Sequence, residues 1–189
     1  GVVSFVIRPS LQNFTREVRM GTLDFVLLKP QDAQFMASIK QFAVWQVVDM
    51  LLGLGIVVIG MLQTASTINI GQFMVFVLML VAGIIIIYSF WLLLATTAFW
   101  WVKVDNIFFI FESMYEAWRY PVTVYPTWLQ FMLTFFVPIA FAITIPAQAL
   151  IGNLSLETGM LAVIIATSIF VISRLVWLWG LRHYSGASA

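Results

Sequence analysis

Long apolar segments separated by short polar ones run along most of this chain, and that pattern predicts helices that cross a membrane. A helix needs about 20 apolar residues to cross a bilayer. Three segments meet this requirement without complication, and we predict them as spans: 42–62, 71–97 and 159–180. The sequence therefore predicts an all-α, polytopic transmembrane helix bundle.

Residues 8–40 form the clearest water-facing segment, which we call the foot. It contains five of the nine Lys and Arg residues, namely Arg8, Arg16, Arg19, Lys29 and Lys40. Because positive charge accumulates in cytoplasmic loops, we expect the foot to be cytoplasmic. The apolar residues 1–7 are too few to cross a bilayer, so we interpret them as the end of an earlier span.

A short amphipathic helix is predicted within the foot, over 10–18. Ser10 follows a proline and is expected to be its N-cap. One side of this helix is apolar at helical spacing, through Leu11, Phe14 and Val18. Gly21 is expected to end the helix, and Pro30 marks the break before the next segment.

The segment 99–119 is apolar but carries charged residues on one predicted helix face, at i, i+7, i+11 and i+14: Asp105, Glu112, Glu116 and Arg119. Such a helix can lie in the membrane interface, with Glu116 paired to Arg119. Alternatively it spans, with the charged stripe turned to a partner or an aqueous path. Each charge facing lipid costs about 2.5–3.5 kcal/mol. The stripe is therefore our candidate for a pathway or a subunit interface.

Prolines crowd the next segment, and we expect breaks of regular helix at Pro126, Pro138 and Pro146. Because broken backbone at membrane depth must be satisfied by protein or water, the prolines favour a re-entrant pair of short helices over 129–151. Only one of 99–119 and 129–151 spans if the basic tail, 181–189, ends in the cytoplasm. The residues alone leave open which one: the charges favour 129–151 as the span, and the prolines favour 99–119.

Composition supports the membrane assignment and excludes several classes of function. Of the 189 residues, 62% are hydrophobic and 9% are charged, against about 25% charged in an ordinary soluble domain. The net charge of +1 gives no indication of nucleic-acid binding. The sequence contains no P-loop, catalytic or zinc-type motif and no cysteine. We therefore expect no catalytic residue, cofactor or metal site in the chain itself.

Two blocks of sequence resemble the ABC-2 family of exporter permeases, in particular the branch often encoded as two permeases beside a separate ATPase. The first, R-M-G-T-L-D-F-V-L-L-K-P over 19–30, is similar to the family's cytoplasmic R-x-G-T-L-x-x-x-L-L-x-P signature. The second, over 120–152, contains Y-P, Y-P-T-W-L, T-F-F-V-P, P-A and L-I-G, and is similar to the region between the family's fifth and sixth spans. The ending W-G-L-R-H-Y-S-G over 179–186 is also similar.

The resemblance implies a six-span subunit in which the spans of this chain are the third to the sixth, so that the chain is a C-terminal portion. It also implies that 99–119 crosses the membrane and that about 126–151 is a re-entrant element on the outer side. The chain would then be one permease domain, 1–189, with a membrane region over 41–180 and a cytoplasmic tail. Segment 99–119 carries more charge than a typical fifth span of the family.

The resemblance further implies an ATP-driven exporter in a bacterial plasma membrane, with its C-terminus in the cytoplasm. Its partners would be a dimer of ABC ATPase subunits, which holds ATP and Mg²⁺, together with a second permease subunit and the lipid bilayer. The alternative for the whole chain is a channel that is not of the ABC type, or an accessory subunit of a membrane complex.

An exporter needs a segment that couples the ATPase to the spans, and the foot is our candidate. The predicted coupling residues are Phe14, Arg16, Glu17, Arg19, Gly21, Thr22 and Leu23. The apolar side of the foot helix would seat in a groove on the ATPase, and the charged residues would fix its orientation. The alternative is a solvated loop whose basic residues only set the topology.

Overall fold

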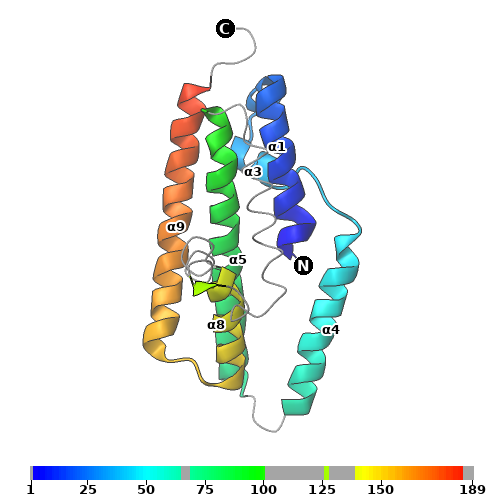
Figure 1. The fold of residues 1–189 in the computed structure, drawn as a ribbon, viewed down its shortest axis with the longest axis vertical. Helices are drawn as coiled ribbons and strands as arrows, with labels where there is room; N and C mark the ends of the chain where they lie inside the picture. Colours follow the sequence, from blue (N-terminus) through cyan, green and yellow to red (C-terminus); the bar gives the residue numbers. More distant parts are fainter. Residues whose placement is uncertain (1, 65–68, 101–125, 128–138, 185–189) are drawn as a thin grey trace.

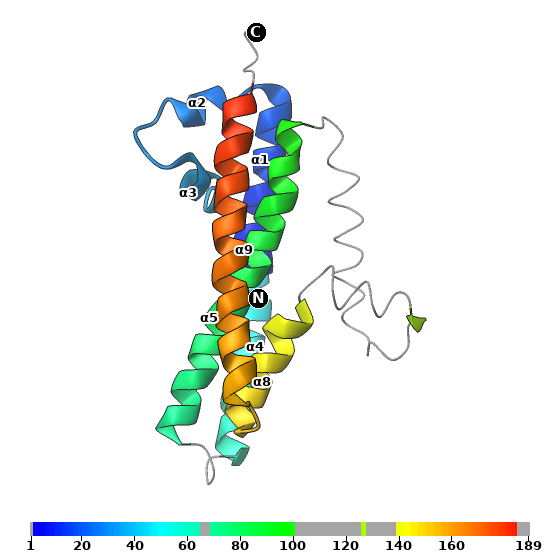
Figure 2. The same cartoon turned by 90° about the vertical axis from the view of Figure 1, so that its left-hand side faces the viewer.

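Two long helices, α5 (Ile70–Thr96) and α9 (Leu156–His183), run side by side in the same direction (Figure 1, Figure 2). The computed structural model to which they belong describes residues 2–64, 69–100, 126–127 and 139–184. Every element assigned within those ranges is a helix, which confirms the prediction of an all-α bundle.

Both α5 and α9 are long and apolar enough to cross a membrane, and they match the predicted spans 71–97 and 159–180. A helix rises 1.5 Å per residue. Their 27 and 28 residues therefore extend about 40 Å, which exceeds the hydrocarbon core of about 30 Å. The short 3₁₀-helix η2 (Thr97–Phe99) follows α5 directly.

A third helix, α4 (Gln46–Thr64), occupies most of the predicted span 42–62 but carries a shorter apolar stretch, Gln46–Gly60. Figure 1 shows α4 beside the bundle rather than within it, and most side chains of its first fifteen residues are exposed. Val57 is an exception, because it packs against the cluster that contains Phe76 of α5. Most of the surface of α4 is therefore turned away from the two long helices.

The helix α8 (Ile139–Ile151) lies in the segment predicted as re-entrant, about 126–151. Its 13 residues extend about 20 Å, which is too short to cross a bilayer. It packs against α5 and α9, and Figure 1 shows it alongside the half of α5 that is farther from α1. A helix of this length is consistent with one of the short helices of the predicted re-entrant element.

Pro146 lies inside α8 and does not break it, so the prediction of a break at this residue is wrong. Proline removes one backbone donor, but neighbouring helices compensate for such losses inside a packed bundle, and Pro146 is buried. Pro126 lies in the exposed dipeptide 126–127. Pro138 lies outside the described residues, as does the predicted span 99–119 beyond Trp100.

The foot folds into three helices: α1 (Arg8–Met20), α2 (Asp24–Leu27) and α3 (Ala33–Ser38). A π-helical turn, η1 (Val3–Ile7), continues into α1 without a break, because the Arg8 N–H donates to the Val3 carbonyl. The predicted start at Ser10 is therefore wrong, since the helix passes through Pro9. Ser10 instead bonds to Gln41: its Oγ donates to the carbonyl at 2.8 Å and accepts from the N–H at 3.0 Å.

Gly21 ends α1, as predicted. Its φ of 69° lies in the left-handed region, which glycine adopts without steric cost. The Thr22 N–H then donates to the Glu17 carbonyl at 3.0 Å, which satisfies an acceptor at the end of the helix. The chain turns here towards α2, which Figure 2 shows projecting from the side of the bundle.

The bundle is elongated, and different parts of its helices lie at its two ends (Figure 1). The C-terminal ends of α1, α5 and α9 lie together at one end, which we call the foot end (Figure 1). Both long helices begin at the opposite end, the far end. There the Ser155 side chain caps α9 by accepting from the Thr158 N–H at 3.2 Å. The foot and the end of α9 thus lie at the same end, as the predicted topology requires.

Candidate functional site

The apolar side of α1 is buried inside the chain, and we call the contact it makes the apolar seat. Phe14 is only 1% exposed. Its ring lies 4.7 Å from that of Trp177 on α9 and 5.5 Å from that of Phe99, measured between centroids. Leu11 belongs to the same core cluster, which includes Trp91 and Leu92 of α5. The foot is therefore packed directly onto both long helices.

This burial contradicts the expectation that the apolar side of α1 seats in a groove on an ATPase. Leu11 and Phe14 are fully buried in the described structure, and Val18 packs against the same cluster. A buried side chain of this size gains about 1.5–3 kcal/mol from its burial, so the spans hold these residues in place. An amphipathic pattern indicates that one side of a helix is buried. Here that side is buried against the chain's own spans.

The other predicted coupling residues take different positions. Leu23 is fully buried in the same cluster as Phe14. Glu17 accepts from the Asn13 side chain at 2.7 Å and forms an ion pair with Lys40, which ties α1 to the segment before α4. Arg16, Arg19 and Thr22 are exposed, and Gly21 forms the turn that ends α1. The predicted set thus divides into internal packing residues and surface residues.

Phe35 on α3 is 61% exposed. At the end of α1 and at α2, three further described apolar residues that the sequence did not single out are strongly exposed. They are Met20, 55% exposed, Phe25, 71% exposed, and Leu28, 82% exposed. Within and beside α2, Leu23 and Val26 are buried, whereas Phe25 and Leu28 are exposed. We call Met20, Phe25 and Leu28 the exposed apolar tip of the foot.

A polar junction joins α3 to α9 through Arg174. Its guanidinium forms a two-pronged ion pair with the Asp32 carboxylate, with Nη1 donating to Oδ1 at 3.0 Å and Nη2 bonded to Oδ2. The same Nη1 donates to the Gln34 Oε1 at 2.6 Å. Planar, bidentate contacts of this kind fix the relative orientation of the two groups as well as their distance.

The junction continues from α3 to α5 through Tyr88. The Gln34 Nε2 donates to the Tyr88 hydroxyl at 2.9 Å. The Ser38 hydroxyl lies 2.8 Å from that of Tyr88 and donates to the Gln34 carbonyl at 2.7 Å. We call Asp32, Gln34, Ser38, Tyr88 and Arg174 together the polar junction. It bonds one short helix of the foot to both long helices.

Asp32 has two structural tasks and remains charged at neutral pH. Its Oδ1 accepts from the N–H groups of Gln34 and Phe35, at 2.9 and 3.2 Å, which caps α3. The hydrogen bond from Arg174 is the main cause that lowers the pKa of the Asp32 carboxyl, and the backbone bonds act in the same direction. The ion pair is therefore fully formed in the physiological range.

Two polar residues within the apolar spans point to this junction, but neither of them predicts it alone. Arg174 is the one charged residue between Glu157 and Arg182, and Tyr88 is the one tyrosine of α5. Each, taken alone, is compatible with a long side chain reaching the membrane surface. The sequence does not show that α3 lies close to these two residues and that its segment supplies the bonding partners of Arg174 and Tyr88.

The other predicted site, the charged stripe of Asp105, Glu112, Glu116 and Arg119, lies outside the described residues. Within the residues that the structure describes, no group of His, Cys, Asp and Glu is arranged to hold a metal ion.

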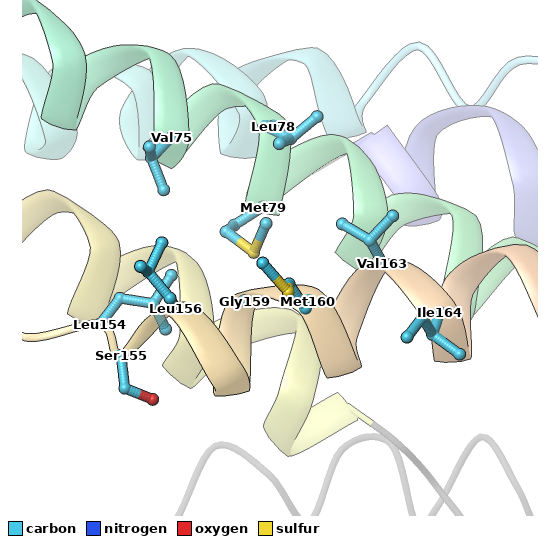
Figure 3. Close-up of a pocket in the computed structure, with 10 residues that line it drawn as sticks. All are labelled: Val75, Leu78, Met79, Leu154, Ser155, Leu156, Gly159, Met160, Val163 and Ile164. Atoms are coloured by element: carbon cyan, nitrogen blue, oxygen red, sulfur yellow. The ribbon is translucent and has the colours of Figure 1, made fainter.

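An apolar hollow of about 480 Å³ lies at the far end, between the first half of α5 and the start of α9 (Figure 3). Met79, Met160 and Ile164 are among its lining residues, and Ser155 is the one lining residue with a hydroxyl. That hydroxyl already bonds to the hydroxyl of Thr158 at 2.7 Å. The hollow can therefore accept hydrocarbon, and none of the described residues that line it is charged.

Comparison with known proteins gives one match. The family model described as "ABC-2 family transporter protein" matches residues 1–188, almost the whole chain. No curated protein and no solved structure matched.

Proposed function

Since the chain belongs to the ABC-2 transporter family and is a membrane permease, we propose that it serves an exporter driven by a separate ATPase subunit. In this proposal the foot end and the C-terminus face the cytoplasm of a bacterial cell, and the spans sit in the plasma membrane. ATP and Mg²⁺ are bound by a dimer of ATPase subunits, and a second permease subunit completes the path.

The observation that carries the coupling proposal is the exposed apolar tip on a foot that is packed firmly onto the spans. Phe25 and Leu28 leave large apolar surfaces uncovered at the foot, where a partner can cover them. Phe14 anchors the same foot between α5 and α9. A partner that moves the tip therefore acts on a segment in direct contact with both long helices.

The proposed ATPase contact differs from the one expected from the sequence. The groove of the ATPase receives Phe25 of α2 and Leu28 directly after it, rather than the buried side of α1. Arg16 and Arg19, which are exposed towards the end of α1, add positive charge to the foot that helps to orient this contact. Gly21 and Thr22 form the turn that presents α2, and Leu23 holds that turn against the core.

The transport path is proposed to be lined by the charged stripe of Asp105, Glu112, Glu116 and Arg119 and completed by the second permease. The family match and the cost of exposing these charges to lipid support this assignment. The apolar hollow at the far end, at the level of α8, adds a surface suited to hydrocarbon groups.

Co-purification tests the proposal. The full-length protein, extracted from its native membrane, should bring with it a polypeptide that contains a P-loop ATPase motif. The double variant Phe25→Ser with Leu28→Ser should insert normally but lose most of that ATPase. Leu156→Ser is the matched control, because Leu156 is 81% exposed but lies at the far end. A purified complex that conducts ions and contains no ATPase would instead support a channel.

A further inference from the structure

We infer that the polar junction is the point at which movement of the foot is passed to the spans, with Asp32 and Arg174 as its positioning residues. This inference rests on the proposed function, because it presupposes an ATPase that moves the foot. It assigns a role in transmission to a set of side chains that bind neither the ATPase nor the cargo.

The first step is the difference between the two contacts that join the foot to the spans. The apolar seat around Phe14 is held by apolar and aromatic packing. Such packing resists separation but is non-directional, so it tolerates sliding and rotation. The polar junction is directional, because the ion pair of Arg174 with Asp32 is two-pronged and Gln34 adds a third bond. A displacement of α3 is therefore followed by α9.

The second step is the position of Arg174 along α9. It lies nine residues before the last residue of that helix, or about 14 Å along the axis, well inside its apolar stretch. A guanidinium within an apolar stretch is more favourable when it is paired. Arg174 therefore keeps its partners throughout the movement of the foot, and α9 stays bound to α3.

The third step is that the same short helix is bonded to both long helices. Gln34 accepts from Arg174 of α9 and donates to Tyr88 of α5. Ser38, one turn later on α3, bonds to the same Tyr88 hydroxyl. A single displacement of α3 thus moves α5 and α9 together, whereas α4 has no part in the junction. The expected consequence is a change in the distance between α9 and α4.

The fourth step is that the ion pair of Asp32 with Arg174 is not needed to keep the protein folded. The Asp32 and Arg174 side chains retain 44% and 35% exposure. Ion pairs with this degree of exposure contribute little to folding stability. Breaking the pair should therefore leave a folded protein in which α9 follows the movement of α3 less closely.

The experiment uses the full-length protein with its ATPase in liposomes and measures the distance between spin labels. The chain contains no cysteine, so Leu54→Cys on α4 and Leu161→Cys on α9, both exposed, give one clean pair. In the otherwise unchanged protein, trapping Mg-ATP on the ATPase should shift this distance. Asp32→Arg alone and Arg174→Asp alone should reduce the shifted population about tenfold, within the range typical of coupling between sites. The exchanged double variant should recover most of the shift.

Two further variants keep the result interpretable. Asp32→Asn retains a side chain that caps α3 but loses the charge, so it should fold normally and still lose the shift. Lys40→Glu is the matched control, because it breaks a different ion pair of the foot, that with Glu17, and should leave the shift unchanged.

The outcomes distinguish a failure of the inference about the junction from a failure of the proposed function. If the ATPase is present and the shift survives in Asp32→Arg, Arg174→Asp and Asp32→Asn, the junction does not transmit and the inference is overturned. The same holds if Lys40→Glu abolishes the shift as completely as they do. If the unchanged protein carries no ATPase, or shows no nucleotide-dependent shift, the proposed function itself fails and the inference falls with it.

Discussion

At the scale of single residues, Phe14 is the side chain that joins the foot to both long helices. Its ring lies against Trp177 of α9 and Phe99 after α5, and almost none of its surface is exposed. Aromatic groups packed edge to face contribute more than their buried area alone. This one ring therefore anchors the foot against both long helices.

Replacing this ring gives the first prediction. Phe14→Ala should lower the stability of the folded protein by about 3 kcal/mol, because it leaves a cavity between two aromatic neighbours. The loss should appear as a lower melting temperature of the purified protein in detergent. Phe25→Ala, which truncates an exposed phenylalanine of the same foot, should change the melting temperature little. Equal effects of the two substitutions would show that Phe14 is not an anchor.

A second residue-scale prediction concerns Gly180 of α9. A Cβ added there would lie 2.4 Å from the Phe99 ring and 3.1 Å from the Thr96 methyl. Exchange of glycine for alanine inside a helix normally stabilises it by about 1 kcal/mol, but overpacking costs about 1–3 kcal/mol.

Gly180→Ala should therefore destabilise the protein or leave no gain. Gly53→Ala on α4, where nothing lies within 4 Å, should stabilise it. Melting temperatures of the two variants in the same detergent make the comparison. A gain at Gly180 as large as that at Gly53 would contradict the packing of η2 against α9.

At the scale of elements, α3 depends on the charge of Asp32, and this gives a prediction about pH. The folded-state pKa of Asp32 is lowered from an ordinary value of about 3.9. Stability from a group with a depressed pKa is present above its ordinary value and is lost as the pH falls through the folded value.

The stability difference between the unchanged protein and Asp32→Asn should therefore be constant from about pH 5 to 8 and fall progressively as the pH drops below about 4. It should not exceed about 1 kcal/mol, because the pair is partly exposed. Melting temperatures of both proteins across this range provide the measurement. A difference that changes between pH 6 and 8 would mean that another group titrates at the junction.

Elements that depend on local chemistry could be predicted from the sequence. The length and apolarity of α5 and α9, and the glycine that ends α1, are examples. The predicted helix start at Ser10 failed, because one π-helical turn carries the helix through Pro9. The predicted break at Pro146 failed because a packed neighbourhood compensates for one missing donor. The first failure has a local cause in the preceding turn, and in the second the tertiary environment overrode a local rule.

The sequence predicted where the candidate site lies, but not which residues of the foot are buried and which are exposed. Leu11, Phe14 and Val18 show that one side of α1 is covered, but a partner and the chain's own spans produce the same pattern. The exposed tip at Phe25 and Leu28 falls in the block that resembles the family signature. Its outward orientation follows from how Leu23 packs. The polar junction required knowledge of which segments meet.

At the scale of the whole molecule, the two ends differ in chemistry. The foot end carries the basic foot, the exposed apolar tip and the polar junction. The far end carries the start of both long helices, the end of α8 and the apolar hollow. This asymmetry suits a permease that is moved from one side of the membrane and acts on its cargo within the membrane or beyond it.

The most direct test of this account is the side of the membrane on which the foot lies. Gln31→Cys in the foot and Glu157→Cys at the far end are both at exposed positions, and the chain has no other cysteine. With a thiol reagent that does not cross membranes, Glu157→Cys should be labelled in intact cells, and Gln31→Cys only after the membrane is opened. Labelling of Gln31→Cys in intact cells would place the foot outside, where no ATPase can reach it, and would contradict the account.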